Sequence, residues 1–583
     1  MHEFRLWAPR VEKLQVVLND RERLPMNGPD KKGWWSLCVE QAGNNTDYAY
    51  LVDDDPTPYP DPRSPWQPRG VHAASRVYDQ SAFQWTDASW HCPPLSAAIL
   101  YELHIGTFSQ EGTFDGAIQH LNHLVDLGIT HVEVMPINEF AGNRGWGYDG
   151  VFLFAPFEPY GGPDGFKRFV NACHEKNLAV VLDVVYNHFG PVGNYTNKFG
   201  PYLTDRFHTP WGAAVNFNEA GSDEVRRFFC DNALMWLKDY HVDGLRLDAV
   251  HEYIDRSAVN FMEQLSSEVE RLGATMGRKF VLIAESDLND PKFVRSREAH
   301  GYGMDAQWSD DFHHSLFTLL WSDPGRGYYD DFGSTEDLVK SLKSVFVFDG
   351  KFSGYRQHSH GRPVDGLSAH HFLGYIQNHD QVGNRAVGER LEHLVGMDAA
   401  KAAVGLVLTA PFIPMLFMGE EFAASAPFLY FADHEEEEMR RLVSEGRKRD
   451  FAAFGWEEKD VPDPEIPETM ERSKLDWTEI HKGEHQQMLE WVKGLIHLRR
   501  TNMDLNDGDL GHLKIECVGN TKALSMQRGP VRVLANFGQH PVKMTIGECD
   551  QLRMKSCEGI VLSGREIAMP RTSFAVVMPS DKK

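Results

Sequence analysis

The sequence predicts an α/β protein in which a (β/α)8 barrel lies between two β-sandwich domains. The middle of the chain alternates short apolar runs with amphipathic helical stretches, the pattern of parallel strands joined by helices. Several apolar runs end in a carboxylate, an asparagine or a histidine, and a barrel carries its chemistry at the carboxyl ends of its strands. Both flanks instead alternate short β-like runs with turn residues, which indicates smaller β domains.

Residues 1–90 are expected to form the first domain. The runs FRLWAP, LQVVLN, WWSLCV and YAYLV are separated by turn residues, and the segment ends in the proline-rich TPYPDPRSPWQPRG. This pattern predicts a β-sandwich followed by a rigid crossing. A purely structural role for the domain is favoured over a binding site of its own.

Residues 91–505 are expected to form the barrel. Strands are predicted at AILYELHIGTF, THVEVMP and LAVVLDVVY, in runs ending at Asp248, Glu285 and Asp380, and at residues 304–308 and 414–420. Helices are predicted at residues 114–127, 164–176, 223–240, 258–272 and 484–500. Residues 187–219 are too irregular for an ordinary connection, so we expect an excursion there beside the barrel mouth.

Residues 506–583 return to short β-like runs, among them KALSMQ, VRVLANF and SFAVVMP. They predict a C-terminal β-sandwich. The acidic run at residues 434–438 is interpreted as a solvated helix face without a function.

Composition excludes several classes of function. The net charge of −25 argues against a nucleic-acid partner, because a phosphate backbone requires clustered Lys and Arg. The longest apolar stretch, residues 402–418, is interrupted by Pro411 and Pro414, so we interpret it as a helix end running into a buried strand and expect no membrane partner. The N-terminus lacks an apolar signal core, and the seven cysteines are scattered without a CxxC pair. We therefore expect a cytoplasmic protein without a thiolate-bound metal.

Polar residues gather at the ends of four apolar runs. In GLRLDAVH, Arg246 and Asp248 are two residues apart, so in a strand they share one face. For this stretch alone, a half-exposed strand with a surface ion pair is an equal alternative. LAVVLDVVYNHF, KFVLIAESD and FLGYIQNHD show the same pattern, and together the four segments favour one shared site.

The motifs DVVYNH, GLRLDAVH, IAES and IQNHD occur in this order and resemble the four short motifs of the α-amylase superfamily. The resemblance implies a retaining glycoside hydrolase with Asp248 as nucleophile, Glu285 as acid and base, and Asp380 as the third carboxylate. Neighbouring strands lie about 4.8 Å apart, which suits the carboxyl separation of about 5 to 5.5 Å in retaining enzymes. The apolar run before Glu285 is of the kind that raises a carboxyl pKa, and Arg246 would keep Asp248 ionised.

The resemblance also implies a set of sugar contacts. His188 and His379 would donate hydrogen bonds to the sugar, Tyr148 would stack beneath it, and Asp183 would brace Arg246. We expect Asn187 to make local hydrogen bonds rather than hold calcium, so no metal or other cofactor is expected. The substrate-binding residues are predicted to be Tyr148, His188, Arg246, His251, Asp311, His313, Asn378, His379 and Arg385.

Longer stretches resemble one subgroup, the maltooligosyltrehalose trehalohydrolases: RGWGYDG, DVVYNHFGPVGNY, GLRLDAVHEYID, WSDDFHH, YIQNHDQVGNRAVGERL and ERSKLDW. This implies cleavage of the α-1,4 bond next to the trehalose end of maltooligosyl-trehalose, and a functional partnership with the synthase that forms that substrate. A glycogen branching enzyme is the alternative, because it has the same domain order and carboxylates. A non-catalytic glucan-binding protein would be expected to have lost one of the three carboxylates, and all three are present.

The segment WSDDFHH is the candidate for trehalose recognition. It follows the sixth strand, so Asp310, Asp311 and His313 could bind hydroxyl groups while Trp308 and Phe312 stack on the sugar. The alternative is that Ser309 and the two aspartates begin a helix.

Overall fold

Eight parallel strands close into a barrel in the middle of the molecule, which confirms the predicted fold class. The computed structural model describes residues 1–321, 327–452 and 456–580, so residues 581–583 of the expected C-terminal domain lie outside the described part. The strands follow one another around the barrel in chain order, and β20 closes against β7. They are β7 (Leu100–Leu103), β8 (His131–Val134), β11 (Ala179–Val184), β14 (Gly244–Leu247), β15 (Val281–Ala284), β16 (Ala306–Trp308), β19 (Phe372–Gly374) and β20 (Ile413–Phe417).

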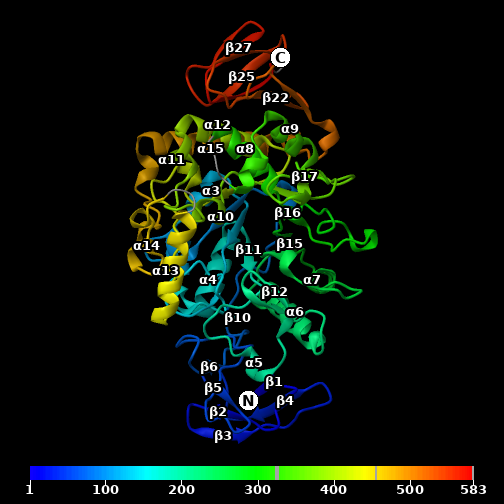
Figure 1. The fold of residues 1–583 in the computed structure, drawn as a ribbon, viewed down its shortest axis with the longest axis vertical. Helices are drawn as coiled ribbons and strands as arrows, with labels where there is room; N and C mark the ends of the chain where they lie inside the picture. Colours follow the sequence, from blue (N-terminus) through cyan, green and yellow to red (C-terminus); the bar gives the residue numbers. More distant parts are fainter. Residues whose placement is uncertain (322–326, 453–455, 581–583) are drawn as a thin grey trace.

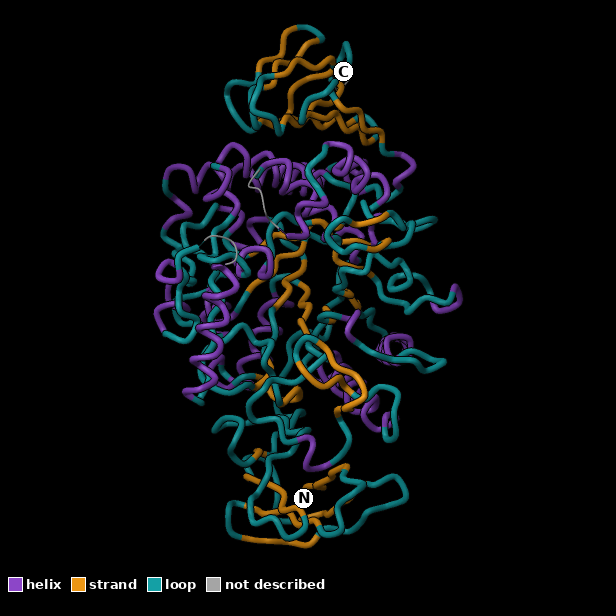
Figure 2. Tube along the Cα trace, viewed as in Figure 1, coloured by secondary structure: helices purple, strands orange, loops and turns teal. Residues whose placement is uncertain are grey.

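Helices lie around the barrel in the middle of the molecule (Figure 2). A long example is α7, which begins after Asn260, whose side chain accepts a hydrogen bond from the backbone N–H of Met262, and ends at Gly277 in the left-handed region. The helices are α1 (Ile105–Phe108), α2 (Phe114–Ile118), α3 (Leu121–Leu127), α4 (Gly162–Glu175), α5 (Thr196–Phe199), α6 (Ser222–Asp239), α7 (Phe261–Met276), α8 (Asp310–Leu320), α9 (Thr335–Ser344), α10 (His379–Gly383), α11 (Leu391–Val395), α12 (Met397–Thr409), α13 (Glu437–Ala452), α14 (Pro467–Arg472) and α15 (Gly483–Thr501).

The predicted single helix at residues 114–127 is wrong, because the structure divides it into α2 and α3. Between them the backbone N–H of His120 donates to the carbonyl of Ala117, three residues earlier, at 3.0 Å. Such a tightened turn interrupts the α-helical bonding pattern. By contrast, residues 402–418 do run from α12 into the buried strand β20, as predicted.

The acidic run at residues 434–438 is only partly solvated. Residues 435–438 are exposed, but His434 is buried. Its Nδ1 lies 2.7 Å from Oε1 of Glu465, which draws the side chain inward. The assignment of His434 to a solvated face is therefore wrong, whereas residues 435–438 are exposed as predicted.

Antiparallel sheets occupy the two ends of the elongated molecule (Figure 1). At one end β1 pairs with β4, and a four-stranded sheet has the order β3-β2-β5-β6. At the other end a five-stranded sheet, β21-β22-β23-β28-β25, packs through Leu534 and Val577 against Met544 and Ile567 of the three-stranded sheet β24-β27-β26. The bounds are β1 (His2–Trp7), β2 (Leu14–Leu18), β3 (Glu22–Pro25), β4 (Trp34–Val39), β5 (Asp47–Val52), β6 (Ser75–Arg76), β21 (Lys514–Cys517), β22 (Ala523–Arg528), β23 (Val531–Asn536), β24 (Val542–Thr545), β25 (Asp550–Lys555), β26 (Val561–Ser563), β27 (Glu566–Met569) and β28 (Ser573–Pro579).

Shorter strand pairs lie in the connections. In residues 187–219, the hairpin of β12 (Leu203–Thr209) and β13 (Gly212–Val215) follows α5. The other pairs are β9 (Asn138–Glu139) with β10 (Phe152–Pro156), and β17 (Phe352–Ser353) with β18 (His358–Ser359). Within the described residues, no helix combines the length and apolar character needed to cross a membrane.

The barrel interior changes character along its axis. Leu100, Val181 and Ile283 belong to an apolar cluster that fills one level. At another level, Glu102 and Glu133 are register partners on β7 and β8, as are Asp183 and Arg246 on β11 and β14. Charged side chains buried in this way need partners, and Arg246 and Asp183 find them beneath the strand ends described next.

Candidate active site

The three predicted catalytic carboxylates lie at the carboxyl end of the barrel. Asp248 follows β14 and Glu285 follows β15, each within one residue of its strand. Asp380 was expected at the end of the seventh strand, but β19 ends at Gly374 and Asp380 belongs to the short helix α10. The side chain of Asn378 accepts a hydrogen bond from the backbone N–H of Gln381 at 2.8 Å, which caps α10 and turns the chain early.

Arg246 connects the carboxylates beneath the site. Its Nη1 donates to both oxygens of Asp183, at 3.1 and 2.9 Å, and to Oδ1 of Asp248 at 2.6 Å. Its Nη2 lies 3.6 Å from Oε2 of Glu285. The guanidinium lies 4.3 Å from the centroid of the Trp308 ring, so a cation–π contact also holds it in place. One buried cation thus spans Asp248 and Glu285 and places them side by side.

Both oxygens of Asp248 accept hydrogen bonds. Asn187 donates to Oδ2 at 2.7 Å and to the Asp248 carbonyl at 3.0 Å, while Arg246 donates to Oδ1. Asn187 therefore makes the local bonds that the sequence predicted. These donors fix the orientation of both carboxylate oxygens of Asp248.

Glu285 lies in a different environment. Burial raises its pKa and the charge of Asp248 adds to the effect, although Arg246 opposes it. Its Oε2 accepts a hydrogen bond from the backbone N–H of Ala249 at 2.7 Å. Ala249 has φ 41° and ψ 51°, a strained left-handed conformation for a residue with a Cβ atom. Two adjacent carboxyl groups, one held by donors at both oxygens and one with a raised pKa, are an arrangement suited to a nucleophile and an acid.

A hydrogen-bonded chain that includes His379, the residue before Asp380, leads into the barrel. His379 Nδ1 lies 2.5 Å from Oε1 of Glu102, and its Nε2 lies 2.8 Å from the hydroxyl of Tyr148. That hydroxyl donates to Oδ2 of Asp183 at 2.7 Å. Burial disfavours the charge on His379, but Asp380 and Glu102 raise its pKa to about 9. The ring is therefore a cation at neutral pH and can donate from both nitrogens.

His188 and His251 lie at the sides of this group. The His188 ring is bonded through Nδ1 to Oδ1 of Asn187 and stacks on Trp211 with centroids 5.0 Å apart. Burial lowers the pKa of His188, which favours its neutral form. His251 Nε2 lies 4.0 Å from Oδ1 of Asp287.

Three predicted sugar contacts have other partners in the structure. Oδ2 of Asp311 accepts hydrogen bonds from the backbone N–H groups of residues 347 and 348, at 2.6 and 2.9 Å. His313 is buried, with Nε2 3.1 Å from the Tyr329 hydroxyl, and Arg385 pairs with Glu389 at 3.2 Å. Their substrate contacts stay predictions, and no bond in this structure joins them to the three carboxylates.

Trp308 and Phe312 are buried, 2 % and 0 % exposed, so the expectation of open stacking surfaces there is wrong. Trp308 packs on Arg246, and Phe312 packs on Phe412. Helix α8 does begin directly after Ser309, but the Ser309 side chain makes no capping bond.

Sequence reasoning missed Glu102 and Trp211, and it named Asp310 only as one of several possible hydroxyl-binding residues. The Asp310 carboxylate accepts a hydrogen bond from the Tyr375 hydroxyl; burial raises its pKa to about 8, and the charge of Glu285 contributes. A glutamate inside the apolar run AILYELHIGTF was the available signal for Glu102. Trp211 lies 50 % exposed in the irregular excursion, where no periodicity marks it.

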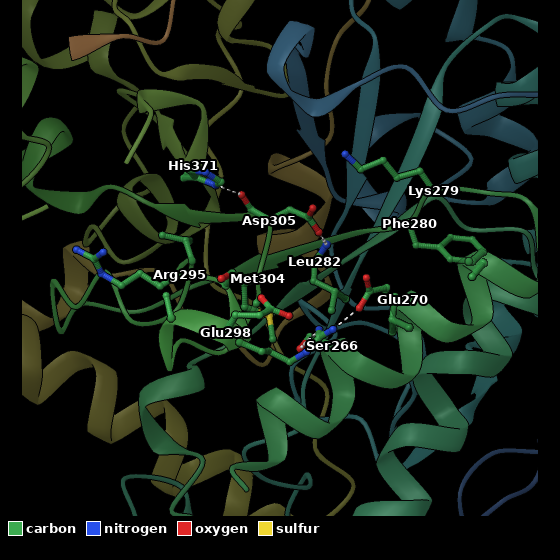
Figure 3. A pocket seen from close by; sticks show the side chains of 18 of the residues that line it. Ser266, Glu270, Lys279, Phe280, Leu282, Arg295, Glu298, Met304, Asp305 and His371 are labelled. Carbon is green, nitrogen blue, oxygen red and sulfur yellow. Dashed lines mark hydrogen bonds and ion pairs between the residues drawn. The ribbon is translucent and has the colours of Figure 1, made fainter. Parts of the chain in front are cut away.

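The described residues contain no cluster of three or more His, Cys, Asp or Glu side chains arranged to hold a metal ion. A cavity of about 970 Å³ has none of the three carboxylates in its lining (Figure 3). We place the candidate site at the carboxylates because their bonding and shared cation supply chemistry that the cavity lacks.

Comparisons with known proteins agree with the observed barrel fold. Residues 22–203 match the family model "Alpha amylase, catalytic domain". A malto-oligosyltrehalose trehalohydrolase from Rhizobium sp. (strain M-11) is 43 % identical over 581 residues, covering 98 % of this chain and 97 % of the relative. The same-named protein of Arthrobacter ramosus is 46 % identical and covers 92 % of this chain and 93 % of its own.

Other relatives are more distant. The crystal structure of a proposed alpha amylase from Salmonella typhimurium has a TM-score of 0.90 and 34 % identity, covering 99 % of this chain and 97 % of that one. A 1,4-alpha-glucan branching enzyme of Pseudoalteromonas atlantica is 28 % identical over 59 % of this chain and 53 % of its own.

Proposed function

This chain belongs to the malto-oligosyltrehalose trehalohydrolase family, and on that premise we propose that it hydrolyses the α-1,4 bond next to the trehalose end of maltooligosyl-trehalose. The products are trehalose and a maltooligosaccharide. It is a glycoside hydrolase of the alpha-amylase family. The observation that carries the proposed mechanism is Arg246 between Asp248 and Glu285, with donors on both oxygens of Asp248 and a raised pKa at Glu285.

In the first step, protonated Glu285 gives its proton to the glycosidic oxygen while Asp248 attacks the anomeric carbon. The bond to the leaving oxygen breaks and trehalose departs, leaving the maltooligosyl unit esterified to Asp248. In the second step, the Glu285 carboxylate takes a proton from water, which attacks the same carbon and releases Asp248. Asn187 and Arg246 hold the two oxygens of Asp248 during both steps.

The sugar at the cleavage point is held by groups around these two carboxylates. Asp380, whose side chain is 45 % exposed, accepts from its hydroxyl groups, and the cationic His379 lies with Nε2 3.5 Å from Oδ2 of Asp380. His188, whose Nδ1–H donates to Oδ1 of Asn187, can accept through Nε2 from the other side, and the ring of Tyr148 packs beneath the sugar. The rigid chain of Glu102, His379, Tyr148 and Asp183 keeps these groups in one geometry.

The trehalose end requires polar partners beyond Glu285, because a site that pairs its hydroxyl groups rejects substrates that leave those partners unpaired. Asp310 is the residue of the WSDDFHH segment that supports this role, because its carboxyl group is near enough to Glu285 and Asp287 to be affected by their negative charges. The carboxylate of Asp311 is already bonded to the backbone of residues 347 and 348.

The substrate of this reaction must be made by an enzyme that converts the reducing end of a maltodextrin into trehalose, so a maltooligosyl-trehalose-forming synthase is the proposed functional partner. We place both activities in the cytoplasm. Seven free cysteines are compatible with a reducing compartment.

Product analysis tests the proposal. Purified enzyme is incubated with maltooligosyl-trehalose, and free trehalose is the expected product. New α-1,6 branch points without trehalose would instead identify a branching enzyme. An Asp248→Asn variant serves as the control, since it should release no trehalose and form no covalent glycosyl-enzyme.

A further inference from the structure

The cavity of about 970 Å³ lies at the end of the barrel opposite the carboxylates. Its lining includes residues that directly precede β15, β16 and β19, whereas Asp248 and Glu285 follow their strands. The fold explains its position, because the connection from β15 to β16 contains only the short turn Arg297–Ala299 where a barrel helix would lie. Helix α7 forms one wall of the cavity (Figure 3).

A second cavity of about 650 Å³ continues from the first. It is lined by parts of residues 343–349, 363–368 and 509–511, and the two cavities share Gly366 and Leu367. A Cβ atom on Gly366 would have no neighbour within 4 Å, so the junction is open. The two cavities together form one elongated trough, a shape suited to a chain rather than to a compact metabolite.

The trough presents many polar and charged groups, without a dominant charge. Leu282 and Met304 lie centrally but are buried, while the charged ends of Lys279 and Arg295 lie toward the edges (Figure 3). Charges of both signs adjoin one another: Arg297 pairs with Glu270, and Lys279 interacts electrostatically with the partly buried Asp305. The hydroxyl groups of a sugar chain both donate and accept hydrogen bonds, so they match such a mixed lining.

We propose that this trough binds a neutral α-glucan chain, separately from the active site. The choice of glucan rests on the proposed function, which supplies that chemical class. The bound segment would hold a long substrate or product on the enzyme without taking part in cleavage.

Ala274 and Thr275 provide a matched pair of variants. Both are exposed near the end of α7, but only Ala274 lines the trough. In a Glu285→Gln background that cannot turn over, calorimetric titration with maltohexaose should give one more binding site than the active site alone supplies. Ala274→Trp should remove that site, and Thr275→Trp should keep it.

An unchanged stoichiometry in Ala274→Trp, or no site beyond the active site in the background enzyme, would overturn the proposal. The assay measures binding in an inactive variant, so its failure is independent of product identity. Release of branched products by the wild type would contradict the proposed function, but it would not change the number of binding sites measured by calorimetry.

Glu133 carries a second, independent inference. It lies on β8, 1 % exposed inside the barrel, and its register partner on β7 is Glu102. Among the described residues, neither of its carboxyl oxygens has a hydrogen-bond partner. Two adjacent buried carboxylates repel each other, and only Glu102 is bonded to His379.

The cations that face Glu133 already have acidic partners. Arg246 on β14 is bonded to Asp183 on β11, and His379 on α10 is bonded to Glu102 on β7. A third anion would have no cation of its own. Burial, reinforced by the charge of Glu102, raises the pKa of Glu133 well above its usual range.

We infer that Glu133 is a positioning residue that serves as a neutral carboxylic acid in the working enzyme. Because Glu133 is uncharged, it does not compete for the two cations: His379 stays paired with Glu102, and Arg246 stays paired with Asp183 and Asp248. Ionisation would place a competing charge beside both cations and loosen the chain that orients Tyr148.

An amide replaces a neutral acid well and a carboxylate poorly. Glu133→Gln should therefore keep kcat within about threefold of the wild type at neutral pH, whereas Glu102→Gln at the register position should lose on the order of tenfold or more. The infrared difference spectrum of the wild type minus Glu133→Gln at neutral pH should contain a protonated carboxyl band. Glu133→Leu offers a second variant, also expected to fold, because it removes no charge.

Equal losses in Glu133→Gln and Glu102→Gln would show that Glu133 is ionised. A difference spectrum without that band, taken against either Glu133→Gln or Glu133→Leu, would overturn the inference as well.

Discussion

The two ends of the barrel both bury networks of charged groups, but they use them differently. At the amino end, Asp243 accepts hydrogen bonds from the backbone N–H of Val180, the Trp90 indole and His174, at 2.9, 2.8 and 2.9 Å, and pairs with Arg278 at 3.1 Å. Its side chain is 1 % exposed. At the carboxyl end, Glu285 is 15 % exposed and Asp380 is 45 % exposed.

The amino-end network is saturated and joins separate segments. Asp87, in the crossing from the N-terminal domain, accepts from both His174 and His241 at 2.8 Å. The His174 ring stacks on Trp90 and the His241 ring on Trp85, which excludes water from the cluster. Burial of charge does not by itself mark a catalytic site; unused bonding capacity that faces solvent distinguishes the carboxyl end.

The largest expected effect is at the carboxyl end. Glu285→Gln keeps the shape of the side chain but has no proton to give, so kcat should fall by about 10²- to 10⁴-fold. The melting temperature and the affinity for maltooligosyl-trehalose should change little. Near-normal trehalose release by this variant would reject Glu285 as the acid.

Asp243→Asn should give the opposite result. Removing the charge of Asp243 leaves His174 and Arg278 without their buried anionic partner. Such a loss typically costs about 3–5 kcal/mol of unfolding free energy. Thermal unfolding would measure the loss, while kcat per folded molecule should stay near the wild-type value. A large fall in kcat without destabilisation would mean that the two ends are coupled.

Asp311→Ala sharpens the boundary between the two behaviours. The backbone N–H groups of residues 347 and 348 would lose their acceptor, at a cost of about 1–3 kcal/mol of stability. We expect kcat/KM to change equally for maltooligosyl-trehalose and for a maltodextrin of equal length. A selective loss on the trehalose substrate would restore the recognition role that the sequence predicted for Asp311.

The smallest effect is a pH dependence at the amino end. Burial opposes the charge on His174, but Asp243 and Asp87 raise its pKa above the usual 6.5. The stabilisation is therefore fully present below about pH 6.5 and is lost as the pH rises through the higher folded-state value. Melting temperatures of the wild type should fall across that range more steeply than those of His174→Gln, and parallel curves would contradict the assignment.

The sequence alone determined the barrel, the flanking β domains and the positions of Asp248 and Glu285. These features follow from local patterns, because apolar strands alternate with helices and each carboxylate directly follows an apolar run. The spacing of Arg246 and Asp248 needs nothing more than the two-residue period of a strand.

Only the tertiary structure decided which neighbouring side chains meet. Asp310 and Asp311 are adjacent in sequence, but successive helical residues point about 100° apart, so one reaches Tyr375 near Glu285 and the other the backbone of residues 347 and 348. Glu102 meets His379 across 277 residues, a pairing that no local period encodes. The same applies to the trough, which lies where residues 285–305 connect β15 to β16 without a barrel helix.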